Sequence, residues 1–582
     1  MPDRLLTTLL RIVDGDRVSR RRIARQGLVL GAFLGAGVLS LLPVLRATGW
    51  PGNHEDGAIF ARTAIYAQHL RHLDFLPVWS DSDAYGMGTP MPAGYHNLFF
   101  WVAGGLSLVG WTLKAAVVTT LLAVLLVGMY GMRRCLLRLG VPSLLASVGG
   151  IALAVAPYTF TDWYTRGDLA EFTGMMLVPW ILCWSVDVVA GNKVSFWIVP
   201  LILVTFLADD LVAYLGLVLT AGAFLAALLT NPGRRRLVRR YGSAMVACGV
   251  AIAPFMLLKR AFDGDYDING VVPTGLAPPY GLHPLREYFL PGNFDWADPD
   301  PLSMTVTVGL ALWVGLAVVL VWRAGQRLSP EPGITVQAFL RRPEVLLAGV
   351  VVVGMAVQVP AIAGAHRLPL VHHIAPVWRL EAFITPALIA LVVSMGWRCV
   401  SNRPSAALLG ASGAALMVLG LVVSSPVTDS KPGTVDLGAY TPARIQSAGS
   451  GLGNLLLANG GYLPVVHAGA ARESTATVYN TYEQLASNNG GLTVLRGPCQ
   501  VEVEARTFEA SVRTFQVNCT GPGTVALPIS FNSFSTVRWA GRSVPYHRID
   551  RDPRMIVELS RGTGRLTVEL PTVWRVLRGS MP

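Results

Sequence analysis

The sequence predicts a polytopic α-helical membrane protein with a β-rich domain outside the membrane. Three observations support this fold class. Only 14% of the 582 residues are charged, against about 25% in ordinary soluble proteins, while 52% are hydrophobic and the mean hydropathy is +0.48. The apolar residues gather into long runs, and these runs stop near residue 425. This composition excludes a disordered chain, a fibrous repeat and a small disulfide-rich scaffold.

The apolar runs predict about eleven transmembrane helices, since a helix needs roughly 17–25 apolar residues to cross about 30 Å of hydrocarbon. The expected spans lie near residues 27–47, 115–132, 143–160, 169–189, 194–208, 211–229, 241–258, 302–322, 344–362, 380–397 and 405–424. The apolar stretch 98–113 is expected to be a non-spanning helix at the outer surface. If it crossed, the basic loops that follow would change sides.

The basic residues predict the orientation of the chain. Residues 1–26 form an arginine-rich tail without a signal-peptide cleavage pattern, so we expect this tail in the cytoplasm. Counting spans from there places every later basic loop on the same side, as the positive-inside rule requires. These loops carry Arg133, Arg134 and Arg138, then Arg234, Arg235, Arg236, Arg239 and Arg240, then Arg323, Arg327, Arg341 and Arg342, and finally Arg398 and Arg403. An odd number of spans puts residues 425–582 outside the cytoplasm.

The net charge of +12 is therefore interpreted as anchoring to the lipids of the cytoplasmic leaflet. A nucleic-acid partner would call for a basic face with exposed aromatic residues on a soluble domain. The sequence offers no such face, so no nucleic-acid partner is expected.

Residues 425–582 alternate between apolar and polar positions and are punctuated by glycine and proline, which predicts strands. A β-sandwich is the expected architecture. Cys499 and Cys519 flank two strand-like runs, 500–507 and 510–517, which are expected to form a hairpin. A disulfide between these two cysteines is expected in an oxidising compartment. The other four cysteines lie in or beside apolar runs and are expected to act as small apolar residues.

The first outer loop, residues 50–97, is long and polar, and long ordered loops are uncommon unless they are functional. Glu55 and Asp56 follow the first span closely and are expected at the membrane interface. A carboxylate in that place can take a proton from a sugar hydroxyl. The alternative is a structural role, in which residues 53–56 cap a helix that begins near Gly57.

Two arginines are expected at the outer ends of spans. Arg166 lies with Glu171 after the third span, where a charge is costly unless it is paired or functional. Its guanidinium can bind a lipid-linked phosphate in a fork, or it can pair with Glu171 and only fix the helix ends. Arg379 lies beside Trp378 before the tenth span and can form a clamp for the leaving phosphate together with Arg166.

Metal sites are less well supported by the sequence. The histidines at 366, 372 and 373 lack the spacing of a zinc site, so zinc is not expected. A calcium-loop pattern begins at Asp265 but has Leu276 at its twelfth position instead of glutamate, and it fails there. The pair Asp209-Asp210 either binds a divalent cation or caps a helix. No metal ligand is assigned, and a requirement for Mg²⁺ or Ca²⁺ stays open.

Motifs in three regions of the chain, which are the first outer loop, the end of the third span and the segment before the tenth span, resemble those of a known family. They are His54-Glu55-Asp56-Gly57 with Leu76-Pro77-Val78-Trp79 and Tyr85-Gly86-Met87-Gly88-Thr89-Pro90, then Arg166-Gly167 with Glu171, and then Pro376-Val377-Trp378-Arg379. In this order they resemble the C-fold (GT-C) glycosyltransferases. More narrowly they resemble the bacterial YfhO-like membrane proteins called 6-pyruvoyl-tetrahydropterin synthase related. The resemblance covers most of the membrane body and, more loosely, the β-rich tail.

The resemblance implies a bacterial inner-membrane glycosyltransferase that inverts the anomeric carbon. Its donor would be a polyprenyl-phosphate sugar and its acceptor a lipid, glycan or protein outside the cytoplasm. Asp56 would be the catalytic base, with Glu55 as the substitute. The expected donor-phosphate and substrate ligands are Arg166, Arg379, Glu171, His54, Tyr95 and His96. The sequence departs from the family at Ala208-Asp209-Asp210, where relatives often have a histidine-containing turn, which leaves the basis of acceptor choice open.

Two other functions remain open from the sequence. A flippase or transporter of lipid-linked sugars would place charges inside spans and show repeated halves, and no clear repeat is seen. A non-catalytic scaffold would use its β-domain to bind glycan or a partner. No Walker motif, dinucleotide fingerprint or Gly-x-Ser-x-Gly motif is present, so direct use of a nucleotide is not expected.

Overall fold

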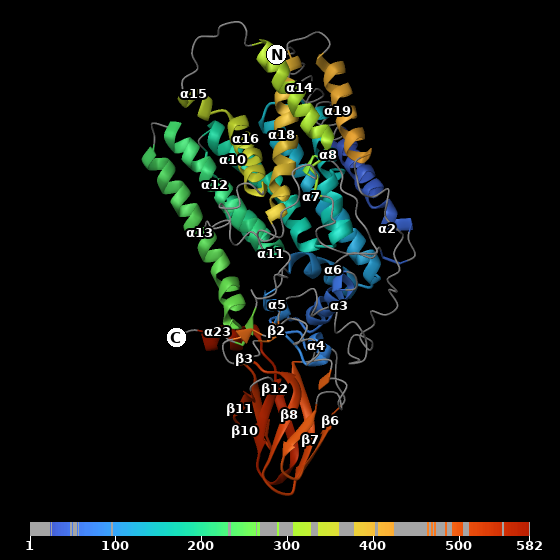
Figure 1. Cartoon of the computed structure of the whole chain (residues 1–582), viewed down its shortest axis with the longest axis vertical. Helices are drawn as coiled ribbons and strands as arrows, with labels where there is room; N and C mark the ends of the chain where they lie inside the picture. Colours follow the sequence, from blue (N-terminus) through green and yellow to red (C-terminus); the bar gives the residue numbers. More distant parts are fainter. Residues whose placement is uncertain are drawn as a thin grey trace, which may run out of the picture.

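The computed structural model describes part of the chain in detail. The described residues are 24, 26–46, 49–50, 55, 58–94, 97–191, 193–230, 234–263, 265–267, 288–289, 306–326, 336–359, 377–401, 406–423, 463–464, 467–468, 471–472, 484–485, 492–504, 511–549 and 552–580. They form a bundle of helices and, beyond one end of it, a β-domain (Figure 1).

The helices follow the apolar runs of the sequence, and each of the eleven expected segments overlaps a helix. The bundle contains the helix Gln26–Ser40, α2 (Leu42–Arg46), α7 (Leu113–Arg138), α8 (Ser143–Ala154), α9 (Pro157–Phe160), the π-helix η1 (Thr161–Arg166), α10 (Leu169–Gly191), α11 (Ile198–Ala208), α12 (Asp210–Thr230), α13 (Arg234–Ala261), α14 (Leu310–Gln326), α15 (Val336–Leu340), α16 (Pro343–Gln358), the 3₁₀ turn η5 (Val377–Leu380), α18 (Glu381–Val400) and α19 (Ala406–Val423).

Within the described residues, five helices are long and apolar enough to cross a membrane, and a bent pair makes a sixth if it counts as one span. The five are Leu113–Arg138, Leu169–Gly191, Asp210–Thr230, Arg235–Ala261 and Trp378–Val400, and the bent pair is Ser143–Ala154 with Pro157–Arg166. The chain is thus a multi-pass membrane protein. The count of eleven transmembrane helices and the direction in which the chain is inserted stay predictions.

Helix α10 is the central helix of the bundle and is buried along nearly its whole length. Two glycines of α7 allow α7 and α10 to pack closely. A Cβ atom added at Gly128 would lie 2.4 Å from Met176 Sδ, and one added at Gly131 would lie 2.5 Å from Trp180 Nε1. Small residues allow helices to pack at short range in membranes, where the hydrophobic effect does not drive helix association.

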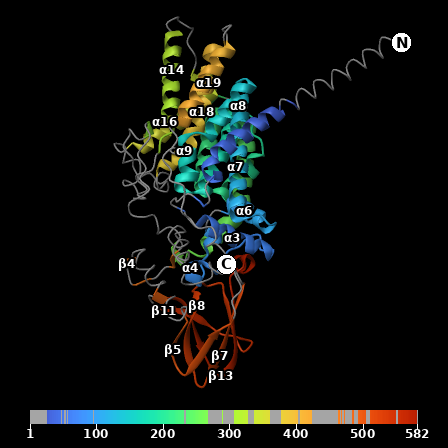
Figure 2. The same cartoon turned by 90° about the vertical axis from the view of Figure 1, so that its right-hand side faces the viewer.

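A layer of short helices lies between the bundle and the β-domain (Figures 1 and 2). It consists of α3 (Ala58–Arg71), α4 (Asp83–Gly86), α5 (Met91–Gly94) and α6 (Leu98–Leu108). Helix α6 has 11 residues and is about 16 Å long, too short to cross a bilayer. This length agrees with the prediction of a non-spanning helix at 98–113.

The β-domain is a sandwich of two antiparallel sheets, as predicted. One sheet has the strand order β10-β9-β13-β7-β6 and the other the order β11-β12-β8-β5. The strands are β5 (Thr493–Arg496), β6 (Cys499–Val503), β7 (Val512–Cys519), β8 (Gly523–Ser530), β9 (Thr536–Trp539), β10 (Arg542–Ser543), β11 (Tyr546–Ile549), β12 (Asp552–Leu559) and β13 (Gly562–Glu569). Within the described residues, two pairs of two-residue strands lie outside the sandwich: β1 (Tyr266–Asp267) pairs with β2 (Leu463–Pro464), and β3 (His467–Ala468) pairs with β4 (Ala471–Arg472).

The predicted hairpin and its disulfide are both confirmed. Strands β6 and β7 pair antiparallel with Cys499 opposite Cys519, and the two cysteines are joined by a disulfide. Phe515, Val517 and Cys519 point inward from alternate positions of β7, which is the pattern expected of a strand with one buried face. The other four cysteines are free and buried.

One buried arginine of the sandwich fastens it to the short-helix layer. The Arg513 guanidinium of β7 donates to the carbonyl oxygens of Asp81 (2.6 Å), Gly86 (2.6 Å) and Pro528 (2.7 Å) and pairs with the Asp81 carboxylate at 3.3 Å. Its side chain is 6% exposed. A guanidinium can serve several acceptors at once because it has five donors in a planar fork.

Candidate functional site: a shared carboxylate–guanidinium cluster

A break in the third predicted span creates the first part of the site. After α9 the chain continues as the π-helix η1 and then turns at Gly167, whose φ of 72° is easily adopted only by glycine among common residues. The Asp168 N–H donates to the Asp162 carbonyl oxygen at 3.1 Å and closes this turn. The Arg166 guanidinium therefore lies 2.5 Å from Asp162 Oδ1 and 3.0 Å from Asp168 Oδ2. Isolated π-helical turns of this kind are frequent at functional sites.

The 3₁₀ turn η5 brings Arg379 to the same carboxylates. Arg379 Nη2 lies 3.0 Å from Asp168 Oδ2, the oxygen that Arg166 also binds. Glu171, in the first turn of α10, is shared as well, because its Oε2 lies 3.1 Å from Arg166 Nη1 and 2.5 Å from Arg379 Nε. Two guanidinium groups from distant parts of the sequence are thus held side by side by the same two carboxylates.

The cluster is largely shielded from solvent. The side chains of Asp162 and Glu171 are 0% and 1% exposed, Arg166 is 9% exposed, and Arg379 is the most open at 21%. The Tyr158 hydroxyl donates to Glu171 Oε1 at 2.8 Å. The Arg166 guanidinium also lies 4.4 Å from the ring centroid of Trp378, a cation–π contact. The exposure of Arg379 makes it the guanidinium that an anion can reach most readily.

The acidic segment of the first outer loop meets this cluster. The Glu55 N–H donates to the Arg166 carbonyl oxygen at 3.2 Å, and the Ala58 N–H donates to the Glu55 carbonyl oxygen at 2.8 Å where α3 begins. The Glu55 carboxylate pairs with the buried Arg62. Burial raises the pKa of the Glu55 carboxyl to about 6; the charge of Asp168 acts in the same direction and Arg62 opposes it.

The structure therefore joins four of the predicted site residues, which are Glu55, Arg166, Glu171 and Arg379. The predicted Arg166–Glu171 ion pair exists and belongs to a larger shared cluster, while phosphate binding by Arg166 stays a prediction. Four further predicted residues lie outside the described part of the chain: His54, Asp56, Tyr95 and His96. Asp56 directly follows Glu55 in the chain, and α3 does start within two residues of it, as the helix-cap alternative predicted.

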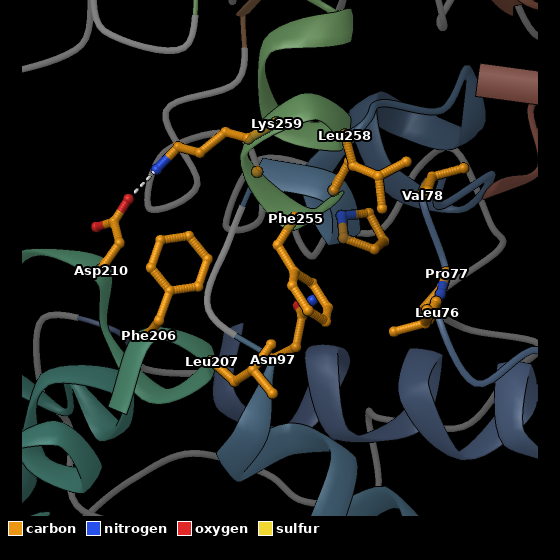
Figure 3. A pocket seen from close by; sticks show the side chains of 13 residues that line it. Leu76, Pro77, Val78, Asn97, Phe206, Leu207, Asp210, Phe255, Leu258 and Lys259 are labelled. Carbon is orange, nitrogen blue, oxygen red and sulfur yellow. Dashed lines mark hydrogen bonds and ion pairs between the residues drawn. The ribbon is translucent and has the colours of Figure 1, made fainter. Parts of the chain in front are cut away.

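The pair Asp209-Asp210 divides its tasks. Asp209 Oδ1 accepts a hydrogen bond from the Val212 N–H at 2.8 Å and so caps α12. The negative charge of the Asp209 carboxylate also attracts the Arg379 guanidinium. Asp210 forms an ion pair with Lys259 of α13 at the edge of a pocket (Figure 3). Apolar side chains from the loop 76–78 and from α5, α11 and α13 line this pocket, and Figure 3 shows Leu76, Val78, Phe206, Phe255 and Leu258 around it.

The predicted metal sites gain no support from the described residues. No group of three or more histidine, cysteine, aspartate or glutamate side chains in that part of the chain is arranged to hold a metal ion. Asp265, the first residue of the failed calcium loop, instead accepts from the N–H and hydroxyl of Ser533 at 2.8 and 2.7 Å and fastens the sandwich. The histidines at 366, 372 and 373 lie outside the described residues.

Sequence reasoning missed several members of the cluster. Asp162 and Asp168 lie within the stretch that drew attention to Arg166, yet neither was assigned a role. Their spacing of four residues before and two residues after Arg166 is a usable signal, because it lets both carboxylates reach one guanidinium across a turn. Arg62 was also missed; a lone arginine in the apolar run of α3 is costly without a partner and predicts a nearby acid.

A second buried polar pair lies just beyond the cluster on α18. Gln358 Nε2, at the end of α16, donates to Glu381 Oε1 at 3.0 Å, and both side chains are fully buried. Glu381 is two residues from Arg379. No functional role was predicted from the sequence for Gln358 or Glu381.

No known protein family and no curated protein matches the chain, so the narrower resemblance to YfhO-like proteins is not confirmed. Solved structures with a related arrangement include the arabinofuranosyltransferase AftD from Mycobacteria, with a TM-score of 0.40 and 17% identity over 68% of this chain. They also include the oligosaccharyltransferase AglB from Archaeoglobus fulgidus in complex with an inhibitory peptide and a dolichol-phosphate, with a TM-score of 0.44 and 10% identity over 71% of this chain.

This chain spans 27% of the AftD chain and 57% of the AglB chain. Both names are those of glycosyltransferases. With TM-scores below 0.5 and identities of 17% or less, the likeness carries no argument about activity, which has to come from the cluster.

Proposed function

We propose that this protein is a membrane glycosyltransferase that moves a sugar from a polyprenyl-phosphate donor to an acceptor on the side of the membrane where the β-domain lies. One observation carries the proposal: Arg166 and Arg379 are held together by Asp168 and Glu171. The backbone of Glu55, in the first outer loop, donates a hydrogen bond to the carbonyl oxygen of Arg166. Sugar transfer from a lipid phosphate needs a cationic site for the leaving phosphate and a carboxylate for the acceptor proton.

In the proposed reaction the oxygen of an acceptor hydroxyl attacks the anomeric carbon of the donor sugar. The bond between that carbon and the phosphate oxygen breaks, and the phosphate leaves with the bonding electrons. The hydroxyl proton passes to the Asp56 carboxylate, with Glu55 as the alternative acceptor. Attack opposite the leaving group inverts the configuration of the anomeric carbon. The guanidinium groups of Arg379 and Arg166 stabilise the negative charge of the departing lipid phosphate.

The carboxylates around the two arginines serve to hold them in place. Asp168 and Glu171 fix both guanidinium groups in one orientation before a substrate arrives, so less conformational entropy is lost when phosphate binds. Arg379 is the more exposed of the two and is proposed to make the first contact with the donor phosphate, while the more deeply buried Arg166 supports it from behind. Helix α6 is proposed to wall the groove that admits the prenyl chain.

A divalent cation remains an open part of the proposal. The acids Asp162, Asp168 and Glu171 of the cluster are engaged with arginines, and the described residues contain no group arranged to hold a metal ion. No step is therefore assigned to a metal ion. Assay of the purified protein with excess chelator tests a requirement for Mg²⁺ or Ca²⁺ directly.

The proposal is tested by incubating purified protein with radiolabelled polyprenyl-phosphate sugars and a membrane extract as the source of acceptor. An enzyme releases polyprenyl phosphate and labels the acceptor in detergent. A flippase moves label only across a sealed vesicle and leaves the donor intact. A glycan-binding scaffold does neither. Release of polyprenyl phosphate in detergent supports the transferase, and an intact donor under all conditions contradicts it.

A further inference from the structure

Helix α23 (Val573–Ser580) follows the last strand of the sandwich and has two unlike faces. Val576 is fully buried, and the partly buried Val573 and Leu577 pack against the same apolar cluster. On the other face Trp574 is 69% exposed and Arg578 is exposed as well. These two residues are four positions apart, so their side chains lie on one side of the helix.

The position of this exposed face relative to the membrane follows from α13. Helix α23 packs against the end of α13 that lies next to the β-domain (Figure 1). There Val576 shares an apolar cluster with Leu258 and Phe262. Trp574 and Arg578 are therefore carried at the end of a helix that is long and apolar enough to span the membrane.

The lipid-facing side of α13 shows how far the hydrocarbon reaches. Its exposed apolar side chains include Val246 (68%), Val250 (69%) and Leu257 (48%). Leu257 lies four residues before the end of the helix at Ala261, or about 6 Å along the axis. The exposed stripe therefore continues to within roughly one turn of the point where α23 docks, so we expect the lipid headgroups at this level.

We propose that α23 is an interfacial helix that binds the phospholipid headgroups of the leaflet on the β-domain side. Trp574 inserts its amphipathic ring at the headgroup level, as tryptophan commonly does at membrane interfaces. Arg578 binds lipid phosphate, and anionic lipids are preferred because each basic residue near the surface adds attraction to them. Arg575 is less available, since it pairs with Glu569.

This contact would attach the β-domain to the bilayer, in addition to its contacts with the rest of the chain. Arg513 and Asp265 fasten the sandwich to the short-helix layer and to the segment that follows α13. Helix α23 adds a contact to the bilayer itself on the side of α13. The sandwich is thereby held at a fixed height and tilt above the membrane. This inference concerns the β-domain and does not depend on the proposed transferase activity.

The test replaces Trp574 with the photo-crosslinking aromatic residue benzoylphenylalanine in the full-length protein, reconstituted in nanodiscs of phosphatidylglycerol and phosphatidylcholine. The matched control carries the same residue at Ser560, which is exposed in the turn between β12 and β13. That turn lies at the opposite end of strand β13 from Glu569, roughly 25 Å away along the strand. After irradiation the adducts are identified by mass spectrometry.

The proposal expects lipid adducts at position 574 and none at position 560. It also expects that Arg578→Gln lowers the share of phosphatidylglycerol among the adducts by about fivefold, close to the preference contributed by one basic residue. Adducts at 574 to a second protein chain instead of lipid would overturn the proposal. So would equal lipid labelling at both positions, or a lipid share that Arg578→Gln leaves unchanged. If the reporter at 574 prevents insertion, the same reporter at position 578 provides the measurement.

Discussion

The backbone N–H of Glu55 donates a hydrogen bond to the carbonyl oxygen of Arg166 at 3.2 Å. This bond joins the acidic segment of the first outer loop to the π-helical turn that carries the first of the two clustered arginines. The bond joins backbone atoms, so it does not depend on the rotamers of the Glu55 and Arg166 side chains. It holds the backbone of Glu55 beside the turn that carries Arg166, and the proposed reaction needs a carboxylate from this part of the loop close to the guanidinium pair.

Arg379→Lys is expected to lower transfer by roughly 100-fold or more, within the range seen when one charge-stabilising donor is removed from an active site. A lysine ammonium is a compact point charge and does not reproduce the fork that reaches Asp168 and Glu171 together. The measurement is the initial rate of polyprenyl phosphate release. The rate should fall while the unfolding temperature stays close to that of the wild type.

The matched control for this variant is Arg398→Lys. Arg398 belongs to α18, the helix that directly follows η5, pairs with Glu344 at 2.6 Å, and lies about 25 Å from the cluster along α18. Its replacement should leave the rate within about twofold of the wild type. Equal losses for the two variants would mean that Arg379 acts only through stability.

The ionisation of Glu55 should appear in the pH dependence of stability. Its pKa is raised to about 6 in the folded protein, chiefly by burial, from 4.5. A raised pKa means that the contribution of this carboxyl is fully present below pH 4.5 and is lost as the pH rises through 6. The loss is at most about 2 kcal/mol. Thermal unfolding in detergent between pH 4.5 and 7 measures it.

Glu55→Gln should remove this dependence, because glutamine does not titrate. Glu504→Gln serves as the control, since hydrogen bonds from Arg565 and Thr514 lower the pKa of Glu504 to about 2 and move its titration below this window. If the wild type and Glu55→Gln show the same slope between pH 4.5 and 7, Glu55 is not buried as described.

Arg513→Ala should loosen the β-domain from the membrane body. The substitution leaves the buried Asp81 carboxylate without the arginine that now pairs with it and removes three hydrogen bonds to carbonyl oxygens. Breaking a buried pair from one side costs about 3–5 kcal/mol. We expect separate unfolding of the sandwich and faster proteolysis of the loop between α4 and α5.

The control is Arg565→Ala, which removes an exposed pair with Glu504 from the same domain. Surface pairs contribute about 0–1 kcal/mol, so this variant should unfold like the wild type. A single cooperative transition in Arg513→Ala at the wild-type temperature would contradict the assigned role of Arg513.

Double replacement Cys499→Ser with Cys519→Ser should destabilise the sandwich by about 3 kcal/mol, the value expected for a disulfide that closes a loop of this length. Reductant should lower the unfolding temperature of the wild type and leave the double variant unchanged. Sensitivity to reductant that persists in the double variant would mean that other cysteines form disulfides.

The helical body and the sandwich could be predicted because they depend on local patterns. Apolar runs specify helices whatever their neighbours, and the alternation of β7 specifies one buried face. The Cys499–Cys519 pair was also within reach, since both residues flank the same hairpin. Arg166 and Glu171 were predicted together because they are only five residues apart.

The remaining contacts depend on residues that the sequence separates widely. Arg379 shares Asp168 with Arg166 although Asp168 and Arg379 are 211 positions apart, and Arg513 contacts Asp81 although these two are 432 positions apart. No local pattern predicts such pairings. The π-helical turn at 161–166 was also unpredictable, because its residues are compatible with an ordinary helix and only the packed cluster favours the wider turn.

The most direct test of the central claim is the rate of sugar transfer by Asp56→Asn. Asparagine keeps the size of the side chain but cannot take the proton from the hydroxyl of the sugar acceptor. With purified, correctly inserted protein and radiolabelled polyprenyl-phosphate sugar, we predict that this variant binds the donor and releases no polyprenyl phosphate above background. Release at the wild-type rate would contradict the proposed base and with it the proposed reaction.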